Sequence, residues 1–180
     1  MIGVLVSGEG TNLQALLDAG LPVVAVASNV AGARALERAE AVGVTAAAFP
    51  LQGFADRDAR DAAMAEWLEE QGVELVVCAG YMHLLRPSFL ARFPGRVVNV
   101  HPAPLPEFPG AHPLDDVLAA GAIAAAATVH FVDEGVDTGE VIASEPVPVF
   151  PGDTVDTLRE RVHEAEHRLL LKVVRELCAR

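Results

Sequence analysis

The chain has 180 residues, of which 52% are hydrophobic and 21% charged, so it has the size and apolar content of one globular domain. Its net charge of −12 argues against nucleic acid and anionic membranes as partners, although backbone amides could still hold a small phosphorylated ligand. No apolar run approaches the ~20 residues that span a bilayer. Residues 1–6 lack the flank of a signal peptide, and Cys78 and Cys178 form no disulfide or zinc pattern, so we expect a cytoplasmic protein without a metal.

Strand and helix patterns alternate through the first half of the chain. Strands are predicted at 2–6, 23–27, 45–49, 75–79 and 97–100, and helices at 12–19, 33–42, 56–71 and 87–92. This alternation is typical of an α/β fold with a mostly parallel central sheet and helices on both faces. The connections are expected to be right-handed, and the functional site is expected at the carboxyl ends of the strands.

The second half of the chain has a different pattern. A helix is predicted at 114–120, and two strands at 124–132 and 140–149 are separated by the glycine-containing loop 133–139. A final helix is predicted from Val155 to Leu177, because apolar residues recur there at intervals of three and four. Asp153 or Thr154 is expected to cap it.

A polar pair interrupts the apolar strand at 97–100. Asn99 and His101 lie two residues apart, so their side chains would project from the same face of a strand. Pro102, Pro104 and Pro106 then prevent a helix or a central strand from following. A proton carrier beside a neutral hydrogen-bond donor suits an active site, but the pair could also simply satisfy each other and close the strand.

A glycine-rich turn, residues 7–13, follows the first strand. Its N–H groups and the end of the next helix offer a binding site to an anion. A dinucleotide fingerprint matches poorly, because Leu13 stands at the third glycine position and Ser28-Asn29 where an acidic residue is expected. A phosphate monoester fits better than NAD, and a plain tight turn is the alternative.

Other polar residues have ordinary interpretations when taken singly. Asp137 lies in a glycine-flanked loop, where an aspartate is usually solvated. If that loop folds back over His101, the carboxylate would raise the imidazole pKa and favour a cation at neutral pH. His163 and Glu166 of the final helix are expected to face solvent. Ser7 lacks the context of a nucleophile elbow, which argues against a serine hydrolase.

Three segments together resemble the folate-dependent phosphoribosylglycinamide formyltransferase family of purine synthesis. Residues 7–13 resemble its phosphate loop, residues 99–112 its catalytic strand and loop, and residues 128–139 its second signature. The segments follow the order of the family over nearly the whole chain. The resemblance implies one Rossmann-like formyltransferase domain over residues 1–180, with an N-terminal half that binds the phosphate and ribonucleotide and a C-terminal half that binds folate.

The resemblance also implies an activity and a set of site residues. The formyl group of 10-formyltetrahydrofolate, the co-substrate, would pass directly to the amine of glycinamide ribonucleotide through a tetrahedral intermediate, in IMP biosynthesis. Asn99, His101 and Asp137 match the catalytic trio of the family, with His101 charged through Asp137. Substrate contacts are implied for Gly10, Thr11, Asn12 and Glu166, and folate contacts for Arg57, Met82, His83, Leu84, Leu85, Asn99, Asp133, Glu134, Gly135, Val136 and Asp137.

Two residues depart from the family pattern, since His83 replaces an arginine and Ala126 replaces a glycine. The family also implies a cis peptide at Leu105–Pro106, an uncommon geometry for X–Pro bonds. The alternatives are another formyltransferase or hydrolase that uses 10-formyltetrahydrofolate, or a non-catalytic nucleotide- or folate-binding module on the same fold. We expect the two small molecules as partners, no nucleic acid or membrane, and a monomer or weak homodimer.

Overall fold

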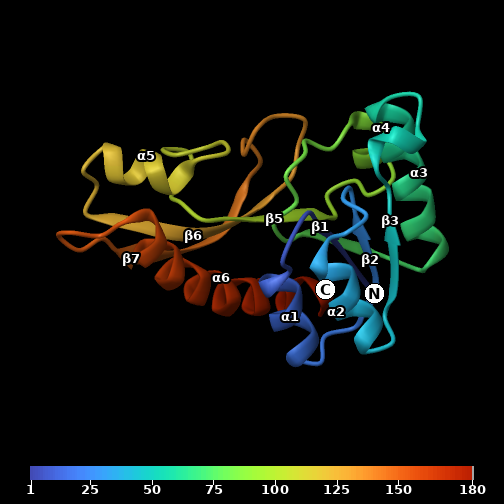
Figure 1. The fold of residues 1–180 in the computed structure, drawn as a ribbon, viewed down its shortest axis with the longest axis horizontal. Coiled ribbons are helices and arrows are strands. Elements are labelled where there is room, and N and C mark those ends of the chain that lie inside the picture. The colour runs from blue at the N-terminus through green and yellow to red at the C-terminus, as the bar shows by residue number, and fades with distance from the viewer. Residues whose placement is uncertain (180) are drawn as a thin grey trace. The chain divides into compact units, whose positions relative to one another are not determined.

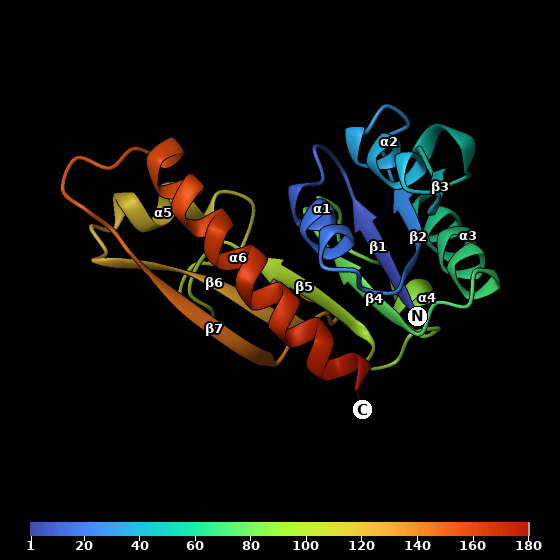
Figure 2. The ribbon, with the colours of Figure 1, turned by 90° about the horizontal axis from the view of Figure 1, so that it is seen from below.

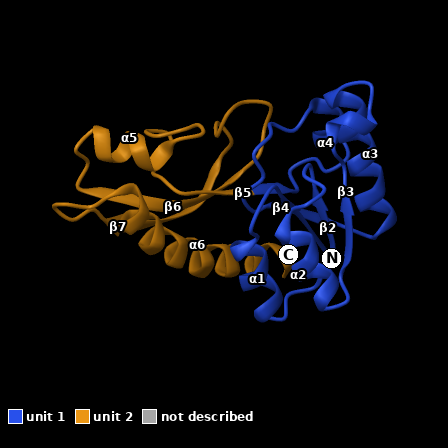
Figure 3. Ribbon diagram, viewed as in Figure 1, with its two compact units in different colours: residues 1–98 blue, residues 99–180 orange. Residues whose placement is uncertain are grey.

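The computed structural model describes residues 1–179, which form an α/β fold in two compact units, residues 1–98 and the residues from 99 onward (Figures 1 and 3). The strands are β1 (Ile2–Val6), β2 (Val23–Ser28), β3 (Thr45–Ala48), β4 (Leu75–Cys78), β5 (Val97–His101), β6 (Ala124–Phe131) and β7 (Val141–Pro148). The helices are α1 (Thr11–Asp18), α2 (Arg34–Ala41), α3 (Arg57–Glu70), α4 (Pro87–Leu90), α5 (Pro113–Ala119) and α6 (Val155–Cys178), with the short 3₁₀ helix η1 (Leu51–Gly53).

The first unit is built on the parallel strands β3-β2-β1-β4, in that order. Every residue of β1 is buried, because a strand covered by helices on both faces must be apolar throughout. Helices α1 and α2 lie on one face of these strands, and α3 and α4 lie on the other (Figure 2). The predicted arrangement of helices about a parallel sheet is confirmed in this unit.

The strand order reverses at β1, which is flanked by β2 on one side and by β4 on the other. The loops that leave β1 and β4 therefore start side by side, and the Ser7 N–H donates to the Gly80 carbonyl oxygen at 3.1 Å. Ligands of open α/β sheets bind at such a reversal, outside the carboxyl ends of the strands. The topology thus brings residues 7–13 and 80–86 to the same edge of the unit.

The second unit contains β6 and β7, which pair antiparallel, and the long helix α6, which packs on both. The apolar stripe predicted for α6 is buried, from Leu158 to Leu177. Strand β5 begins in the first unit and ends in the second, and the full order of seven strands is β3-β2-β1-β4-β5-β6-β7. The mostly parallel α/β sheet that the sequence predicts is therefore confirmed, with its antiparallel pair at the β7 edge.

Small differences from the expected elements have local causes. Strand β5 runs to His101, one residue beyond the predicted 97–100, so the histidine itself belongs to the strand. A 3₁₀ turn at Leu51–Gly53 follows the extended Pro50 and was not predicted. The Leu105–Pro106 peptide is cis, as the family resemblance implies. Within residues 1–179, no helix is both long and apolar enough to cross a membrane.

The N-terminus of α6 generates a prediction about stability. Thr154 Oγ1 accepts from the Thr157 N–H at 3.3 Å, and Thr157 Oγ1 accepts from the Thr154 N–H at 3.0 Å. Thr154→Ala should lower the free energy of unfolding by about 1 kcal/mol, because the Thr157 N–H loses its side-chain acceptor, while Thr154→Ser keeps that acceptor and should lower it much less. Urea denaturation measures both, and equal losses in the two variants would contradict the capping role.

Candidate active site

Asn99, His101 and Asp137 lie together in the second unit. Asn99 and His101 end β5, and Asp137 belongs to the loop between β6 and β7. His101 is 4% exposed, and its Nδ1 lies 3.5 Å from Asp137 Oδ2. The β6–β7 loop therefore folds back over His101, as the catalytic hypothesis requires.

The backbone conformation of the 132–140 loop brings Asp137 back over His101. Asp137 has a φ of 52°, in the left-handed region that aspartate tolerates better than most residues. A side chain at Gly139 would place its Cβ 1.8 Å from the Phe131 carbonyl oxygen, so only glycine fits there. The Gly110 N–H donates to Asp137 Oδ2 at 2.8 Å and thus ties the proline-rich loop to the same carboxylate.

His130 is a further member of the cluster that the sequence reasoning did not select. It is 2% exposed in β6, with Nε2 3.5 Å from Asp137 Oδ1 and 3.2 Å from Asn99 Nδ2. The only sequence signal was its position inside the second signature segment, where it looks like an ordinary strand residue. Asp137 is consequently bracketed by two imidazoles, one on each carboxylate oxygen.

Backbone carbonyls assign the protons of the two imidazoles. His101 Nε2 lies 2.7 Å from the Phe108 carbonyl oxygen, and His130 Nδ1 lies 2.8 Å from that of Phe131. Because a carbonyl oxygen can only accept, each of these nitrogens carries hydrogen. In the neutral rings the other nitrogen of each histidine has a lone pair, and both lone pairs face Asp137. A proton added to either ring at that position would bridge it to the carboxylate.

The charge states differ from the sequence-based expectation for His101. Burial lowers the pKa of His101 below its ordinary value, and this outweighs the Phe108 carbonyl and the Asp137 charge, which both raise it. The expectation that His101 is an imidazolium at rest is therefore wrong. The free energy lost when the charged ring leaves water is larger than the electrostatic stabilisation by the Asp137 carboxylate at 3.5 Å. Burial opposes ionisation of Asp137 too, but the neighbouring His130 ring and the hydrogen bond from the Gly110 N–H lower the pKa of that carboxyl group.

The predicted phosphate loop forms the N-terminus of α1 in the first unit. Gly10 has a φ of 74°, and a Cβ there would lie 2.6 Å from the Ala35 Cβ, so the turn requires glycine. Arg38 Nε donates to the Glu9 carbonyl oxygen at 2.8 Å and holds the loop in place. No side chain caps the helix, so its first-turn N–H groups suit an anion such as a phosphate.

Glu166 of α6 is buried, at 4% exposure, and the expectation that it faces solvent is wrong. It lies beside Ala165 on the packed side of the helix, whereas the side chain of His163 remains 42% exposed. His163 Nε2 is 3.7 Å from Glu166 Oε2. A buried carboxylate requires polar partners, and His163 is one partner of Glu166.

The residues matched to a folate site are divided between the units. Met82 and Leu84 are exposed apolar side chains of the 80–86 loop, and Arg57 Nη2 donates to the Leu84 carbonyl oxygen at 3.4 Å. In the second unit, Val136 is exposed, and the Asp133 carboxylate accepts from Thr138 Oγ1 at 2.6 Å. Met82 and Leu84 of the first unit and Val136 of the second are therefore accessible to a ligand.

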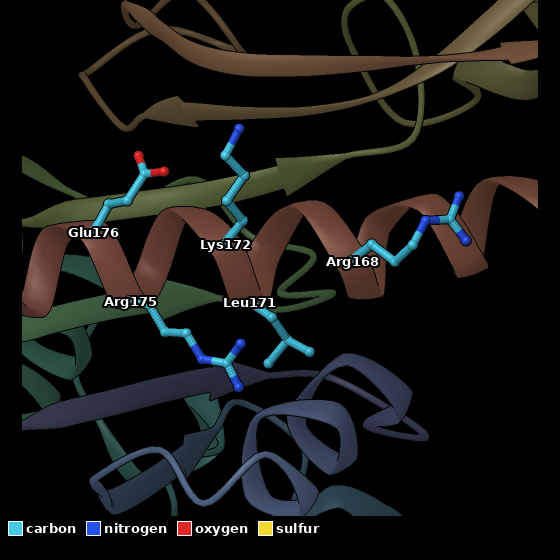
Figure 4. Close-up of a pocket in the computed structure, with 5 residues that line it drawn as sticks. All are labelled: Arg168, Leu171, Lys172, Arg175 and Glu176. Atoms are coloured by element: carbon cyan, nitrogen blue, oxygen red, sulfur yellow. The ribbon is translucent and has the colours of Figure 1, made fainter.

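A hollow on the surface of α6 does not coincide with these residues. It is lined by Arg168, Leu171, Lys172, Arg175 and Glu176. Lys172 and Glu176 extend from one side of the helix and Leu171 and Arg175 from the other (Figure 4). Across residues 1–179, no cluster of three or more histidine, cysteine, aspartate or glutamate side chains is arranged to hold a metal ion.

Comparison with known proteins identifies the family of this chain. The sequence model described as "Formyl transferase" matches residues 1–174. The chain belongs to the formyl transferase family. The phosphoribosylglycinamide formyltransferase of Mycobacterium tuberculosis H37Rv is 45% identical over 178 residues, which is 97% of this chain and 83% of that protein. That of Haemophilus influenzae is 37% identical, over 97% of this chain and 85% of that protein.

Solved structures and longer relatives agree with this grouping. The crystal structure of the phosphoribosylglycinamide formyltransferase of Streptococcus pneumoniae TIGR4 is similar with a TM-score of 0.94 and 45% identity, over 98% of this chain and 97% of that one. The trifunctional purine biosynthetic protein adenosine-3 of Drosophila melanogaster is 42% identical, but the chain spans only 13% of its length. Within the formyl transferase family, the chain therefore groups with the phosphoribosylglycinamide formyltransferases.

The balance between burial and charge at His101 predicts the effect of removing Asp137. Asp137→Asn should lower the His101 pKa further, because the carboxylate favours the imidazolium and its loss leaves burial less opposed. NMR titration of the His101 ring protons measures the shift. Asp133→Asn, in the same loop, should leave the His101 pKa unchanged. An unchanged pKa in Asp137→Asn would show that the carboxylate does not act on this ring.

The position of His130 predicts a change at Asp137 itself. His130→Phe should raise the Asp137 pKa, since the His130 ring lowers it: a proton on Nε2 would be donated to the carboxylate, and phenylalanine has no such group. The carboxyl carbon of Asp137, followed by ¹³C NMR across the acid range, reports this pKa. If it stays where it is in the unaltered protein, His130 has no electrostatic part in the cluster.

Proposed function

We propose that the chain transfers the formyl group of 10-formyltetrahydrofolate to the amine of N1-(5-phospho-D-ribosyl)glycinamide, a step of de novo IMP biosynthesis. The observation that carries the proposal is the convergence of Asn99, His101 and Asp137 within one unit. A proton carrier, a neutral donor and a carboxylate, here linked through His130, are the groups that acyl transfer to an amine needs. Membership of the formyl transferase family gives the same reaction class.

The reaction needs one proton to leave the amine and one to reach the departing nitrogen. The amine lone pair attacks the formyl carbon, and the C=O π electrons move to the oxygen, giving a tetrahedral oxyanion. Collapse re-forms the C=O bond and breaks the bond to N10 of the folate, which takes up a proton. No covalent enzyme intermediate is required, so the residues have to stabilise the oxyanion and move protons.

In this mechanism, His101 and Asn99 supply the donors for the oxyanion. Without substrate, His101 Nε2–H donates to the Phe108 carbonyl oxygen, and Asn99 Nδ2–H donates to His130 Nε2. Substrate binding exchanges these internal acceptors for the developing oxyanion. Asp137 favours a proton on His101 Nδ1, so the ring gains positive charge as the oxyanion forms, although it is neutral at rest.

Substrate binding is proposed to use the residues that the family resemblance assigns within one domain over residues 1–180. Gly10, Thr11 and Asn12 would hold the phosphate through the N-terminus of α1, and Glu166 would contact the ribonucleotide from α6. Met82 to Leu85, with Arg57, and the 133–137 loop would frame the folate, largely through backbone groups. The N-terminal half thus contributes mainly to the ribonucleotide and the C-terminal half mainly to the folate.

The partners, location and oligomeric state proposed for this enzyme are those of a small-molecule transferase. Its partners are the two substrates, with no nucleic acid or membrane, which fits the net charge of −12. We propose a cytoplasmic monomer or weak homodimer that needs no metal. Sedimentation of the purified chain at several concentrations tests the oligomeric state, and addition of a chelator to the transfer assay tests the metal independence.

A formyl-transfer assay with 10-formyltetrahydrofolate, with and without glycinamide ribonucleotide, tests the reaction. His101→Ala and Asn99→Ala should each lower kcat by on the order of 10²-fold, because each removes a group that acts in the transition state. Glu166→Ala should mainly raise KM for the ribonucleotide. Arg159→Gln, an exposed residue of α6, serves as the control. Folate turnover that ignores the ribonucleotide would refute the proposed acceptor.

A further inference from the structure

A buried hydroxyl interrupts the apolar sequence of β6. Thr128 is fully buried, and the other residues from 124 to 129 are alanine and valine. A buried hydroxyl costs free energy unless it is hydrogen bonded, whereas valine has nearly the same shape and no such cost. The proposed reaction gives Thr128 no part, so the presence of the hydroxyl must be explained by what it contacts.

The Thr128 hydroxyl contacts the segment that follows His101. Its Oγ1 donates to the Ala103 carbonyl oxygen at 2.8 Å, and because a carbonyl oxygen can only accept, this contact uses the one hydrogen of the hydroxyl. Thr128 Oγ1 therefore accepts in its 3.1 Å contact with Ser144 Oγ of β7. The Ser144 hydroxyl has a second acceptor in the Ala127 carbonyl oxygen, at 3.3 Å. The two hydroxyls thus connect β6 and β7 to the Ala103 carbonyl oxygen.

The loop of residues 102–110 has few donors of its own. Four of its nine residues are prolines, which have no backbone N–H. Ala103 lies between two of them and is fully buried, where its carbonyl oxygen needs a donor. Thr128 supplies that donor from a neighbouring strand. A side chain outside the loop therefore fixes the start of the loop.

The same loop contacts both the imidazole and the carboxylate of the catalytic cluster. The Phe108 N–H donates to the Pro104 carbonyl oxygen at 3.0 Å, and the Phe108 carbonyl oxygen accepts from His101 Nε2 at 2.7 Å. The Gly110 N–H donates to Asp137 Oδ2 at 2.8 Å. A displacement of the loop therefore changes the surroundings of His101 and of Asp137 together.

We propose that Thr128 is a positioning residue, whose hydroxyl holds the loop of residues 102–110 in the place that His101 and Asp137 require. Thr128 itself is fully buried and acts through the Ala103 carbonyl oxygen. Valine at this position would fill the same space but would leave that oxygen without its donor. The proposal rests on the proposed function for its effect on the reaction rate, whereas the position of the loop can be measured without substrate.

The first test is the His101 pKa in Thr128→Val. The Phe108 carbonyl oxygen raises this pKa, so a displaced loop should lower it. The charged or titratable groups that act on His101 are Asp137 and His130, and the variant leaves both in place. NMR titration of the His101 ring protons, in the absence of substrate, measures the shift.

The second test is the Asp137 pKa in the same variant. The hydrogen bond from the Gly110 N–H lowers this pKa, so its loss should raise it. The carboxyl carbon of Asp137, followed by ¹³C NMR across the acid range, reports the change. Thr128→Ser keeps the hydroxyl and should restore both the His101 and the Asp137 pKa. Thr128→Ala, which matches the four alanines before it, gives the same two measurements if the valine variant does not fold.

The third test is the rate of formyl transfer. Thr128→Val should lower kcat on the order of tenfold, because small displacements of catalytic groups have large effects on rate. KM for both substrates should change much less, since Thr128 contacts neither of them. Thr128→Ser should recover most of the lost kcat.

A matched control separates the position of the loop from general stability. Thr154→Val makes the same substitution at the N-cap of α6 and should leave kcat and the pKa values of His101 and Asp137 unchanged. Unmoved pKa values in Thr128→Val, or a Thr128→Ser variant as impaired as Thr128→Val, would overturn the positioning role. Absence of formyl transfer to glycinamide ribonucleotide by the unaltered protein would instead refute the proposed function, and the two pKa values would still decide whether Thr128 holds the loop.

Discussion

The chemistry proposed for this chain depends on one carboxylate, that of Asp137, held between two buried imidazoles. His101 and His130 each donate one ring N–H to a backbone carbonyl and present the other nitrogen to Asp137 at 3.5 Å. A carboxylate can only accept, so a hydrogen bond to either ring needs a proton on the facing nitrogen, and burial makes that proton costly on His101 in the absence of substrate. The cluster is therefore ready to take up positive charge when negative charge develops beside it, which is the requirement for stabilising an oxyanion.

The two donors of the proposed site have acceptors within the protein in the absence of a substrate. The Asn99 amide and the His101 Nε2–H both have acceptors within the protein, so neither is left as an unsatisfied buried group. Exchange of these acceptors for a substrate oxygen replaces one hydrogen bond with a stronger, charge-assisted one. Such an exchange stabilises the bound ground state little, because its oxygen is neutral, and stabilises the charged transition state more. This difference in binding free energy is what accelerates a reaction.

A buried ion pair also supports a loop of the first unit. Arg60 and Asp61 of α3 are fully buried, Arg60 Nη1 lies 2.8 Å from His83 Nδ1, and Asp61 accepts from the Arg86 backbone N–H. Burial and the charge of Arg60 both lower the pKa of His83.

The sequence by itself determined the α/β class, the succession of elements and the glycines that the loops require. Apolar strands alternating with amphipathic helices have one favourable arrangement, so Ile2–Val6 and the stripe of α6 followed from local pattern. The sequence also placed Asn99 and His101 on one strand face, because two-residue spacing in a strand allows nothing else. The role of Asp137 came only from the family resemblance, since a glycine-flanked aspartate is otherwise a solvated turn residue.

Only the tertiary structure decided which distant groups meet and which of them are charged. His130 looked like an ordinary strand residue until β6 placed it against Asp137, and Glu166 looked solvent-facing until packing of α6 buried it. The neutral state of His101 depends on desolvation by segments far apart in the chain, and no local pattern contains that quantity. Hydrogen-bond partners, burial and pKa values are properties of assembled surroundings, so they could not be obtained from residue order alone.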